Sequence, residues 1–211
     1  MQYLSQRLAS KPASRRGRAS DPGGLPPPQR ERILDAAERL IGEHGCAGTS
    51  IEAIVKAAGV SSVTFYEFFE GKEECFVAAF DRAVEAGATQ IQAATTGLSW
   101  PEQIATGLRT VTALIAAEPA RARLGLVEAQ TGGPGLSVHF EAALDRVATK
   151  LRDGRALDTA PPDLPATHEE ATAGALAWLL RERLETGDLD GLEALYPQLI
   201  DIALAPYLGD G

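Results

Sequence analysis

Two short amphipathic segments meet at a tight turn, and this turn is the feature that most restricts how the chain folds. Apolar residues recur at helical spacing in the first segment, and Gly59 ends it. Ser61 is placed to cap a second helix over about 62–69, with Val60 and Phe65 positioned as a hydrophobic staple. Two helices this short, joined by so tight a turn, predict a helix-turn-helix, the unit that presents the start of its second helix to the major groove of DNA.

The segments around this turn complete a three-helix domain that is expected over residues 28–74. An apolar pattern of helical period begins near its start and continues until Gly45 interrupts it. Thr49-Ser-Ile-Glu52 is a capping-box pattern for the helix that precedes the turn. The acidic residues at 73–74 fall in the first turn of a fourth helix, where the helix dipole favours negative charge, and this helix is expected to reach the mid-nineties.

The rest of the chain, residues 75–211, also follows a helical period. Prolines and glycines divide it into segments, and no segment alternates convincingly with the period of a strand. Five more helices are expected, near 101–117, 119–130, 135–153, 166–186 and 190–207. The predicted fold class is therefore all-α with about nine helices, a three-helix helix-turn-helix domain followed by a larger C-terminal helical domain.

The first 27 residues form a separate segment, rich in Ser, Pro, Gly and Arg. Such a composition cannot bury enough apolar surface to fold, so residues 1–27 are predicted to be a disordered arm. Its first twenty residues hold five basic side chains and no acidic one. The sequence leaves open whether this basic arm contacts DNA or is only a solvated tail.

The net charge of −9 at first argues against a nucleic-acid partner, because a DNA-binding protein must offset phosphate charge. The distribution of the charge answers this objection. Lys and Arg number 10 against 10 Asp and Glu in residues 1–75, but 10 against 19 in residues 76–211. The excess acid therefore lies entirely outside the predicted helix-turn-helix.

Composition also argues against several other classes of protein. With 45% hydrophobic residues in 211, the chain can bury a sizeable core, yet no apolar run approaches the ~18 residues that span a bilayer. There is no secretory signal pattern, so we expect a cytoplasmic protein without a membrane partner. Cys46 and Cys75 lie far apart and the three histidines are scattered, so neither a metal nor a disulfide is expected. No nucleophile–base pair and no cofactor fingerprint is found, and we expect neither an enzyme nor a cofactor.

Three stretches of the N-terminal region form a specific set, Arg32-Ile-Leu-Asp-Ala-Ala37, Ala57-Ala-Gly-Val-Ser61 and Thr64-Phe-Tyr66, together with Phe69 and Lys72-Glu73. The set covers about 45 residues and resembles the tetracycline-repressor (TetR) family of transcriptional regulators. The C-terminal part resembles the family only in its helical layout. Phe68 departs from the pattern, because a histidine is common there, and this puts one contact with the DNA backbone in doubt.

The resemblance implies a one-component regulator, most simply a repressor. Its homodimer would grip a palindromic double-stranded operator through the helix-turn-helix and release it when a small hydrophobic effector occupies a C-terminal ligand-binding and dimerisation domain. An alternative keeps the DNA binding but has no small-molecule inducer, so that the C-terminal domain only dimerises or docks a protein partner. The inducer, the operator sequence, the regulated genes and whether the effect is repression or activation are not readable from the sequence.

The candidate DNA contacts lie on the second helix of the helix-turn-helix and beside it. Tyr66 is one position past the inward Phe65, so its hydroxyl can donate to a phosphate; a partly buried core tyrosine is the alternative. Lys72 opposes the dipole at the start of a helix, which a phosphate partner would explain, although a solvated lysine is also consistent. Short outward side chains at 62 and 63 suit base edges. The full set of predicted contacts is Arg30, Thr49, Ser50, Ser61, Ser62, Val63, Thr64, Tyr66, Glu67 and Lys72.

Two further sets of residues belong to the C-terminal domain. The helices near 166–186 and 190–207 are apolar around much of their circumference, which predicts a homodimer interface with Leu176, Leu180, Leu184, Leu195, Leu199 and Ile202. An apolar cavity with a few polar groups is expected mainly among the helices between about 76 and 153. Its candidate lining is Phe80, Trp100, Leu108, Arg123, Leu124, Val127, Gln130, His139, Phe140 and Trp178, with Glu128 a further candidate. Each of these residues alone is better explained as a core or surface residue.

Overall fold

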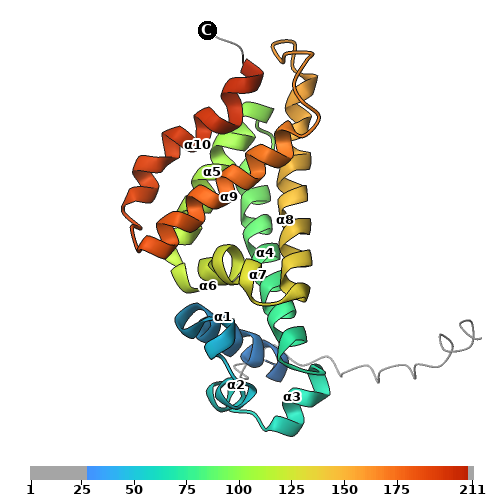
Figure 1. The fold of residues 1–211 in the computed structure, drawn as a ribbon, viewed down its shortest axis with the longest axis vertical. Coiled ribbons are helices and arrows are strands. Elements are labelled where there is room, and N and C mark those ends of the chain that lie inside the picture. The colour runs from blue at the N-terminus through green and yellow to red at the C-terminus, as the bar shows by residue number, and fades with distance from the viewer. Residues whose placement is uncertain (1–27, 209–211) are drawn as a thin grey trace, which may run out of the picture.

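The computed structural model describes residues 28–208, and every regular element in that range is a helix (Figure 1). The predicted all-α fold is confirmed, whereas the predicted arm at 1–27 lies outside the described residues. The first elements are α1 (Gln29–Gly48), α2 (Ile51–Ala58) and α3 (Ser62–Phe68). They are followed by α4 (Lys72–Thr95), α5 (Trp100–Ala117), α6 (Pro119–Arg123), a π-helical segment (Leu124–Glu128), α7 (Ala129–Thr131), α8 (Pro134–Arg152), a 3₁₀ turn (Asp153–Ala156), α9 (His168–Thr186) and α10 (Gly191–Leu208).

Helix α4 connects the two ends of the molecule. It starts beside α1–α3 at the lower end of Figure 1 and continues along the long axis, where it packs against α8 and α5. Because α4 crosses the predicted domain boundary at 74/75 without a break, its movement would displace the three N-terminal helices. The boundary itself remains a prediction.

A first apolar core joins α1–α4 to the start of the C-terminal part. Phe65 of α3 is fully buried, and Phe76 and Phe80 of α4 are 1% exposed. Burying an aromatic or large aliphatic side chain contributes roughly 1.5–3 kcal/mol, so these rings fix α3 and α4 against the apolar stripe of α1. Leu124 and Phe140 enter the same core from the π-helical segment and from α8.

A second core lies between α5, α9 and α10, and it corrects the residues predicted for the dimer interface. Leu176, Leu180, Leu184, Leu195 and Leu199 are at most 5% exposed within the single chain. Their side chains pack with one another and with Ile104 and Ile115 of α5, and Ile202 lies half-buried against the same core. The apolar circumference of these helices is therefore mostly covered by their own protomer, and only their outer faces remain for a second copy.

The ends of α1 and α2 differ in detail from the capping expected from sequence. Gly45 has φ 72° and kinks α1 rather than ending it. The cap of α2 is Ser50, whose hydroxyl accepts from the amide of Ala53 at 3.1 Å, and not Thr49. Thr49 is 1% exposed and donates its hydroxyl to the carbonyl of Gly45 at 2.8 Å. The Thr49 hydroxyl is thus buried and already bonded, so the side chain of this predicted contact residue does not face DNA.

Among residues 28–208, no helix combines the length and the apolar composition that crossing a membrane requires.

Candidate DNA-binding surface

Helix α3 presents an exposed outer face while its inner face is anchored in the core. Val63 is 71% exposed and Tyr66 58% exposed, whereas Phe65 between them is fully buried. Ser62 and Glu67 are exposed on the same outer side. The alternative of a core tyrosine at 66 does not hold, because more than half of Tyr66 is exposed; its ring contacts that of Phe65 edge to face, at 5.5 Å between centroids. Four of the predicted contact residues are therefore brought together on one accessible surface.

The start of α3 is held by its own cap. The hydroxyl of Ser61 accepts the amide of Thr64 at 3.0 Å and lies 3.0 Å from the hydroxyl of Thr64. The cap fixes the direction of the first turn of α3, the turn that carries Ser62 and Val63. Ser61 thus has an intramolecular role in addition to its predicted one, and Thr64 is only partly exposed.

Two arginines of α1 brace the helix-turn-helix from behind. The Arg32 guanidinium donates to the carbonyl of Gly59 in the turn at 3.5 Å, and the Arg30 guanidinium lies 5.6 Å from the Phe69 ring at the end of α3. Gly59 itself adopts φ 62°, the left-handed conformation that lets the chain reverse between α2 and α3. The predicted contact residue Arg30 is exposed, and its guanidinium lies over the Phe69 ring.

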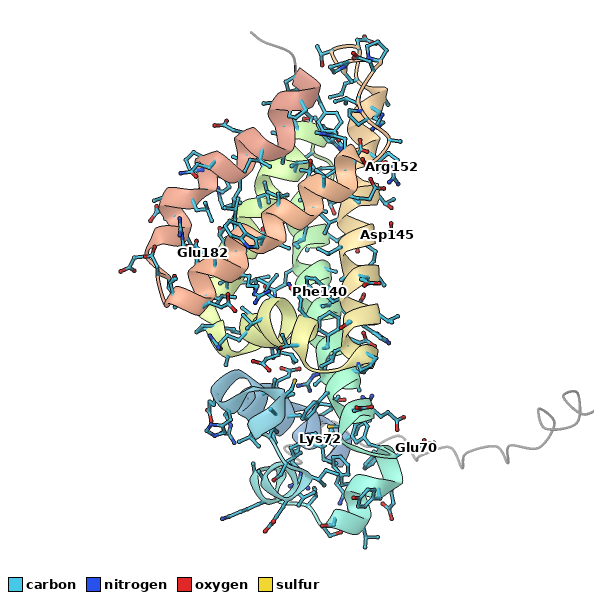
Figure 2. The ribbon with its side chains drawn as sticks, in the orientation of Figure 1. Glu70, Lys72, Phe140, Asp145, Arg152 and Glu182 are labelled. Atoms are coloured by element: carbon cyan, nitrogen blue, oxygen red, sulfur yellow. The ribbon has the colours of Figure 1, made fainter. Side chains whose placement is uncertain are left out.

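Lys72 lies at the start of α4, beside the N-terminal helices (Figure 2), and it has partners within the protein. Its Nζ donates to the carbonyls of Cys46 and Thr49, at 3.2 and 3.3 Å, and lies 5.5 Å from the Phe76 ring. These carbonyls explain why a cation is tolerated at a helix N-terminus, a partnership that the sequence did not reveal. An ammonium has three protons, so one donor remains for a phosphate after both carbonyl bonds are made.

The last residues of α1, from the kink at Gly45 onward, and the residue that follows the helix form an elbow, which we define as Gly45–Thr49, and it is held from two sides. Lys72 bonds its carbonyls from α4, while the carboxylate Oε2 of Glu128 accepts the amide of Cys46 at 2.7 Å. Burial raises the pKa of the Cys46 thiol to about 12; the Glu128 charge and hydrogen bond add to this, and Lys72 opposes it. The thiol therefore stays protonated at neutral pH, and Cys46 has a structural place rather than a reactive one.

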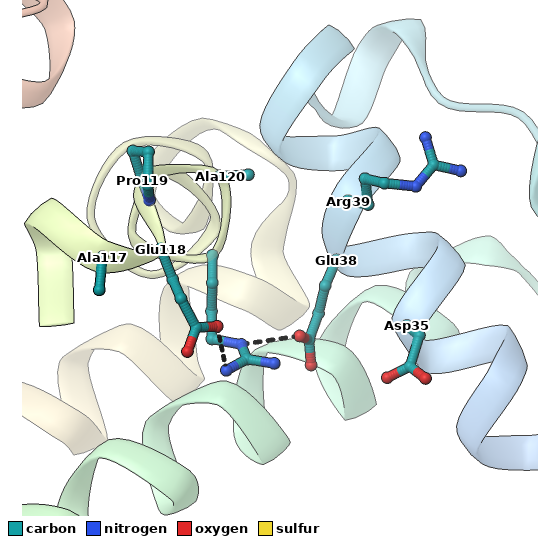
Figure 3. A pocket seen from close by; sticks show the side chains of 8 residues that line it. Asp35, Glu38, Arg39, Ala117, Glu118, Pro119 and Ala120 are labelled. Atoms are coloured by element: carbon teal, nitrogen blue, oxygen red, sulfur yellow. Dashed lines mark hydrogen bonds and ion pairs between the residues drawn. The ribbon is translucent and has the colours of Figure 1, made fainter. Parts of the chain in front are cut away.

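A buried carboxylate links α1 to two helices of the C-terminal part. Glu38 is 4% exposed, and its two oxygens accept from Arg82 of α4 and Arg121 of α6, each at 2.8 Å. Arg121 also pairs with Glu118, and Figure 3 shows both interactions at the edge of an open hollow of about 470 Å³. This hollow is lined by charged and small residues, Asp35, Glu38, Arg39, Ala117, Glu118, Pro119, Ala120 and Arg121.

The structure does not bring the predicted ligand residues into one pocket. Phe80, Leu124 and Phe140 are buried in the first core, while Leu108 and Val127 belong to the second. The polar members bond elsewhere: His139 to Asp81, Gln130 to Arg181, Arg123 to the Leu184 carbonyl, and Trp100 to the Lys150 carbonyl. Trp178 is 61% exposed. A second described hollow, of about 320 Å³, lies between α1 and the end of α2, so neither of the two is lined by these ten residues.

Glu38 is not among the predicted functional residues, and Glu128 was predicted in the ligand cavity. Glu38 carried a local signal, because it lies four residues after Leu34 and three before Ile41, on the apolar stripe of α1. Glu128 carried none, since its partner Cys46 is 82 residues away. Its carboxylate faces the elbow rather than a ligand cavity.

A braced helix-turn-helix, joined through one long helix to a larger helical domain, defines the class of helix-turn-helix proteins with an appended helical domain. Residues 33–79 match the model for bacterial regulatory proteins of the tetR family. This match places the N-terminal region of the chain in the TetR family of transcriptional regulators.

Similarity to characterised regulators is confined to the N-terminal region. The chain is 36% identical to the HTH-type transcriptional repressor ComR of Escherichia coli over 64 residues. These residues make up 30% of each protein. The chain thus matches less than a third of that relative's length.

Solved structures extend the similarity of fold to most of the chain. The fatty acid degradation regulator FadR of Bacillus halodurans has a TM-score of 0.74 at 20% identity, covering 86% of this chain and 97% of that one. FadR of Bacillus subtilis, solved in complex with stearoyl-CoA, has a TM-score of 0.66 at 19% identity and covers 83% and 98%. At this identity the two structures support the fold alone.

Proposed function

We propose that the protein is a cytoplasmic, DNA-binding transcriptional regulator that acts as a homodimer. The observation that carries the proposal is the outer face of α3, where Val63 and Tyr66 are exposed on a helix whose other side is fixed by Phe65. Apolar side chains exposed on a rigid element mark a binding surface, and the second helix of a helix-turn-helix enters the major groove. Repression of nearby genes is the simplest outcome of such binding.

The proposed contacts divide into base-reading and phosphate-binding groups. Val63 meets a thymine methyl and Ser62 bonds a base edge, with Glu67 in reach of a cytosine amino group. Tyr66, Thr64 and Lys72 bind phosphates, together with Arg30 and the capped N-termini at Ser50 and Ser61. Phosphate contacts position the protein, whereas the first group selects the sequence.

The proposed homodimer interface is the outer face of α9 rather than the leucines on its buried side. Ala171, Ala175 and Trp178 are exposed at helical spacing on that face. A large exposed aromatic beside small residues suits close packing of a second copy, because aromatic anchors dominate interface energetics. Each protomer presents one helix-turn-helix unit, α1–α3, which we call its reading head. Two identical reading heads related by a two-fold axis then require a near-palindromic operator.

The proposed effector is a small, mostly apolar molecule that moves α4. A neighbour of similar fold was solved with stearoyl-CoA, and α4 connects the C-terminal helices directly to the helix-turn-helix. A ligand that prefers one position of α4 would change operator affinity by its differential affinity for the two states. The alternative, in which the C-terminal domain only dimerises or docks a protein, is favoured by one observation: the two described hollows are lined largely by charged and small residues.

The direct test is selection of genomic DNA fragments by the purified protein, followed by fluorescence anisotropy on the enriched duplex. We expect one near-palindromic site, and Ser62→Ala and Val63→Ala should change the preferred bases within it. Failure to enrich any duplex would contradict the proposed function. Thermal-shift screening with acyl-CoAs of increasing chain length, then operator release by the hits, separates the ligand-responsive form from the alternative.

A further inference from the structure

The chain passes from α1 to α2 through the elbow at Gly45–Thr49, so the conformation of the elbow sets where α2 begins. Gly45 adopts φ 72°, and a Cβ added there would lie 3.2 Å from both carboxylate oxygens of Glu128. Glycine is therefore required twice at this position, for its backbone conformation and for the close approach of Glu128. The Glu128 carboxylate accepts the Cys46 amide at 2.7 Å, so it lies directly against the elbow and bonds its backbone.

Glu128 ends a π-helical segment that lies between the two cores. Leu124 of this segment is buried in the first core and Val127 in the second, and Leu126 packs against both. A rearrangement of the second core therefore cannot leave the segment unmoved, because packed interiors transmit displacement rather than absorb it. Single π-helical turns inside α-helices occur frequently at functional sites.

We propose that Glu128 is a positioning residue for DNA recognition: its carboxylate holds the elbow through the Cys46 amide, and so makes the orientation of α2 and α3 depend on the packing of the C-terminal cores. The inference rests on the proposed function, and it assigns Glu128 to regulation of the reading head rather than to ligand contact. Lys72 holds the same elbow from the start of α4, so the elbow is bonded both to the π-helical segment and to the long helix that continues into the C-terminal part.

The test compares four variants of the full chain. Glu128→Ala removes the acceptor, and Glu128→Asp withdraws it by one methylene while keeping the charge. Glu128→Gln keeps an acceptor oxygen at the same reach. Glu141→Ala, an exposed glutamate on α8, removes the same charge elsewhere and serves as the matched control.

Two readouts are taken, amide hydrogen exchange of peptides covering the elbow and affinity for the selected operator. Glu128→Ala and Glu128→Asp should speed exchange at the elbow, while a peptide around Cys75 in α4 exchanges as in the wild type. Operator binding should weaken by about tenfold, the size expected for loss of one charge-assisted hydrogen bond. Glu128→Gln should stay within about threefold of the wild type, and Glu141→Ala should match it.

Each outcome bears on one claim. Normal elbow exchange and unchanged operator affinity in both Glu128→Ala and Glu128→Asp would overturn the inference, even though the wild type binds DNA. Faster exchange at Cys75 as well as at the elbow would also overturn it, because Glu128 would then stabilise the fold generally. A wild type that binds no duplex contradicts the proposed function instead, and the exchange data still report whether Glu128 holds the elbow.

Discussion

Arg82 of α4 and Glu38 of α1 form a buried ion pair, with Nε of the guanidinium 2.8 Å from Oε1 of the carboxylate. The remaining guanidinium nitrogens reach Glu31 and Asp35, each at 2.8 Å, so Arg82 contacts three carboxylates of α1. Arg121 of α6 takes the second oxygen of Glu38. One carboxylate therefore links the reading head to both α4 and α6. A movement of either helix would displace Glu38 and, with it, α1.

Replacing Glu38 by Ala should lower the free energy of unfolding by about 3 kcal/mol, because Arg82 and Arg121 each lose their buried carboxylate partner and keep only exposed ones. Urea denaturation followed by circular dichroism measures this. Glu43→Ala is the control on the same helix, since Glu43 and Arg39 form an exposed pair that contributes at most about 1 kcal/mol. Equal destabilisation by the two substitutions would show that the buried network adds no stability.

Lys72→Ala should weaken binding of all duplexes by a similar factor and reduce the salt dependence by about one unit of slope per head, because one phosphate contact is lost. The substitution also removes two bonds to the elbow, so a thermal melt is needed to separate loosening from lost charge.

Tyr66→Phe is the cleaner probe of phosphate binding. It removes one hydroxyl and leaves the exposed ring in place, so operator affinity should fall without a change in melting temperature or base preference. Altered base preference in this variant, measured by repeating the DNA selection, would contradict the assignment of Tyr66 to the backbone.

Trp178→Asp should dissociate the homodimer without unfolding the protomer. The indole is 61% exposed in the single chain, and a central interface tryptophan typically contributes 2 kcal/mol or more, so the dimer should weaken by at least about 30-fold. Analytical ultracentrifugation measures the dissociation constant, with Val147→Asp on α8 as an exposed apolar control. Leu180→Asp is expected to unfold the chain instead, because Leu180 is 5% exposed. Unchanged dimer affinity in Trp178→Asp would move the interface away from this face.

The helices were predictable because their signals are local. Gly59 ends α2 and Ser61 caps α3 through contacts with residues at most four positions away, so the pattern alone indicates them. The same locality explains the misplaced cap of α2. Thr49 and Ser50 both suit a cap, and only the conformation at Gly45 decides that the Thr49 hydroxyl turns back into the protein.

The site was predictable only in part, because its supports are distant in sequence. The exposed face of α3 follows from the helical period around Phe65, whereas the bond from Glu128 to the elbow spans 82 residues and leaves no periodic trace. The leucines of α9 and α10 show a related limit. Their pattern indicates that they are buried, but it does not say whether their own α5 or a second copy covers them.

The end of the molecule farthest from α3 contains a buried carboxylate of its own. Glu169 is fully buried and accepts from Arg155 at 2.6 Å and from the Tyr207 hydroxyl at 2.9 Å. Burial acts to raise the pKa of Glu169, but the hydrogen bonds from Arg155 and Tyr207 outweigh it and lower the pKa from 4.5 to about 2. The ionised form is therefore the one that the fold stabilises.

Glu169→Gln should destabilise the protein at neutral pH by about 2 kcal/mol, the size of a lost hydrogen bond to a charged group. Because the pKa is lower in the folded state, the ionised carboxylate stabilises the fold above about pH 4.5, and this contribution is lost as the pH falls toward about 2. The difference in unfolding free energy between the wild type and Glu169→Gln should therefore be constant from pH 7 to 5 and shrink below that. Thermal and urea unfolding at intervals from pH 7 to pH 3 measure it, with the exposed neighbour Glu170→Gln as a control that costs little at pH 7. A difference that stays constant down to pH 3, or grows as the solution is acidified, would show that the bonds from Arg155 and Tyr207 do not favour the ionised form.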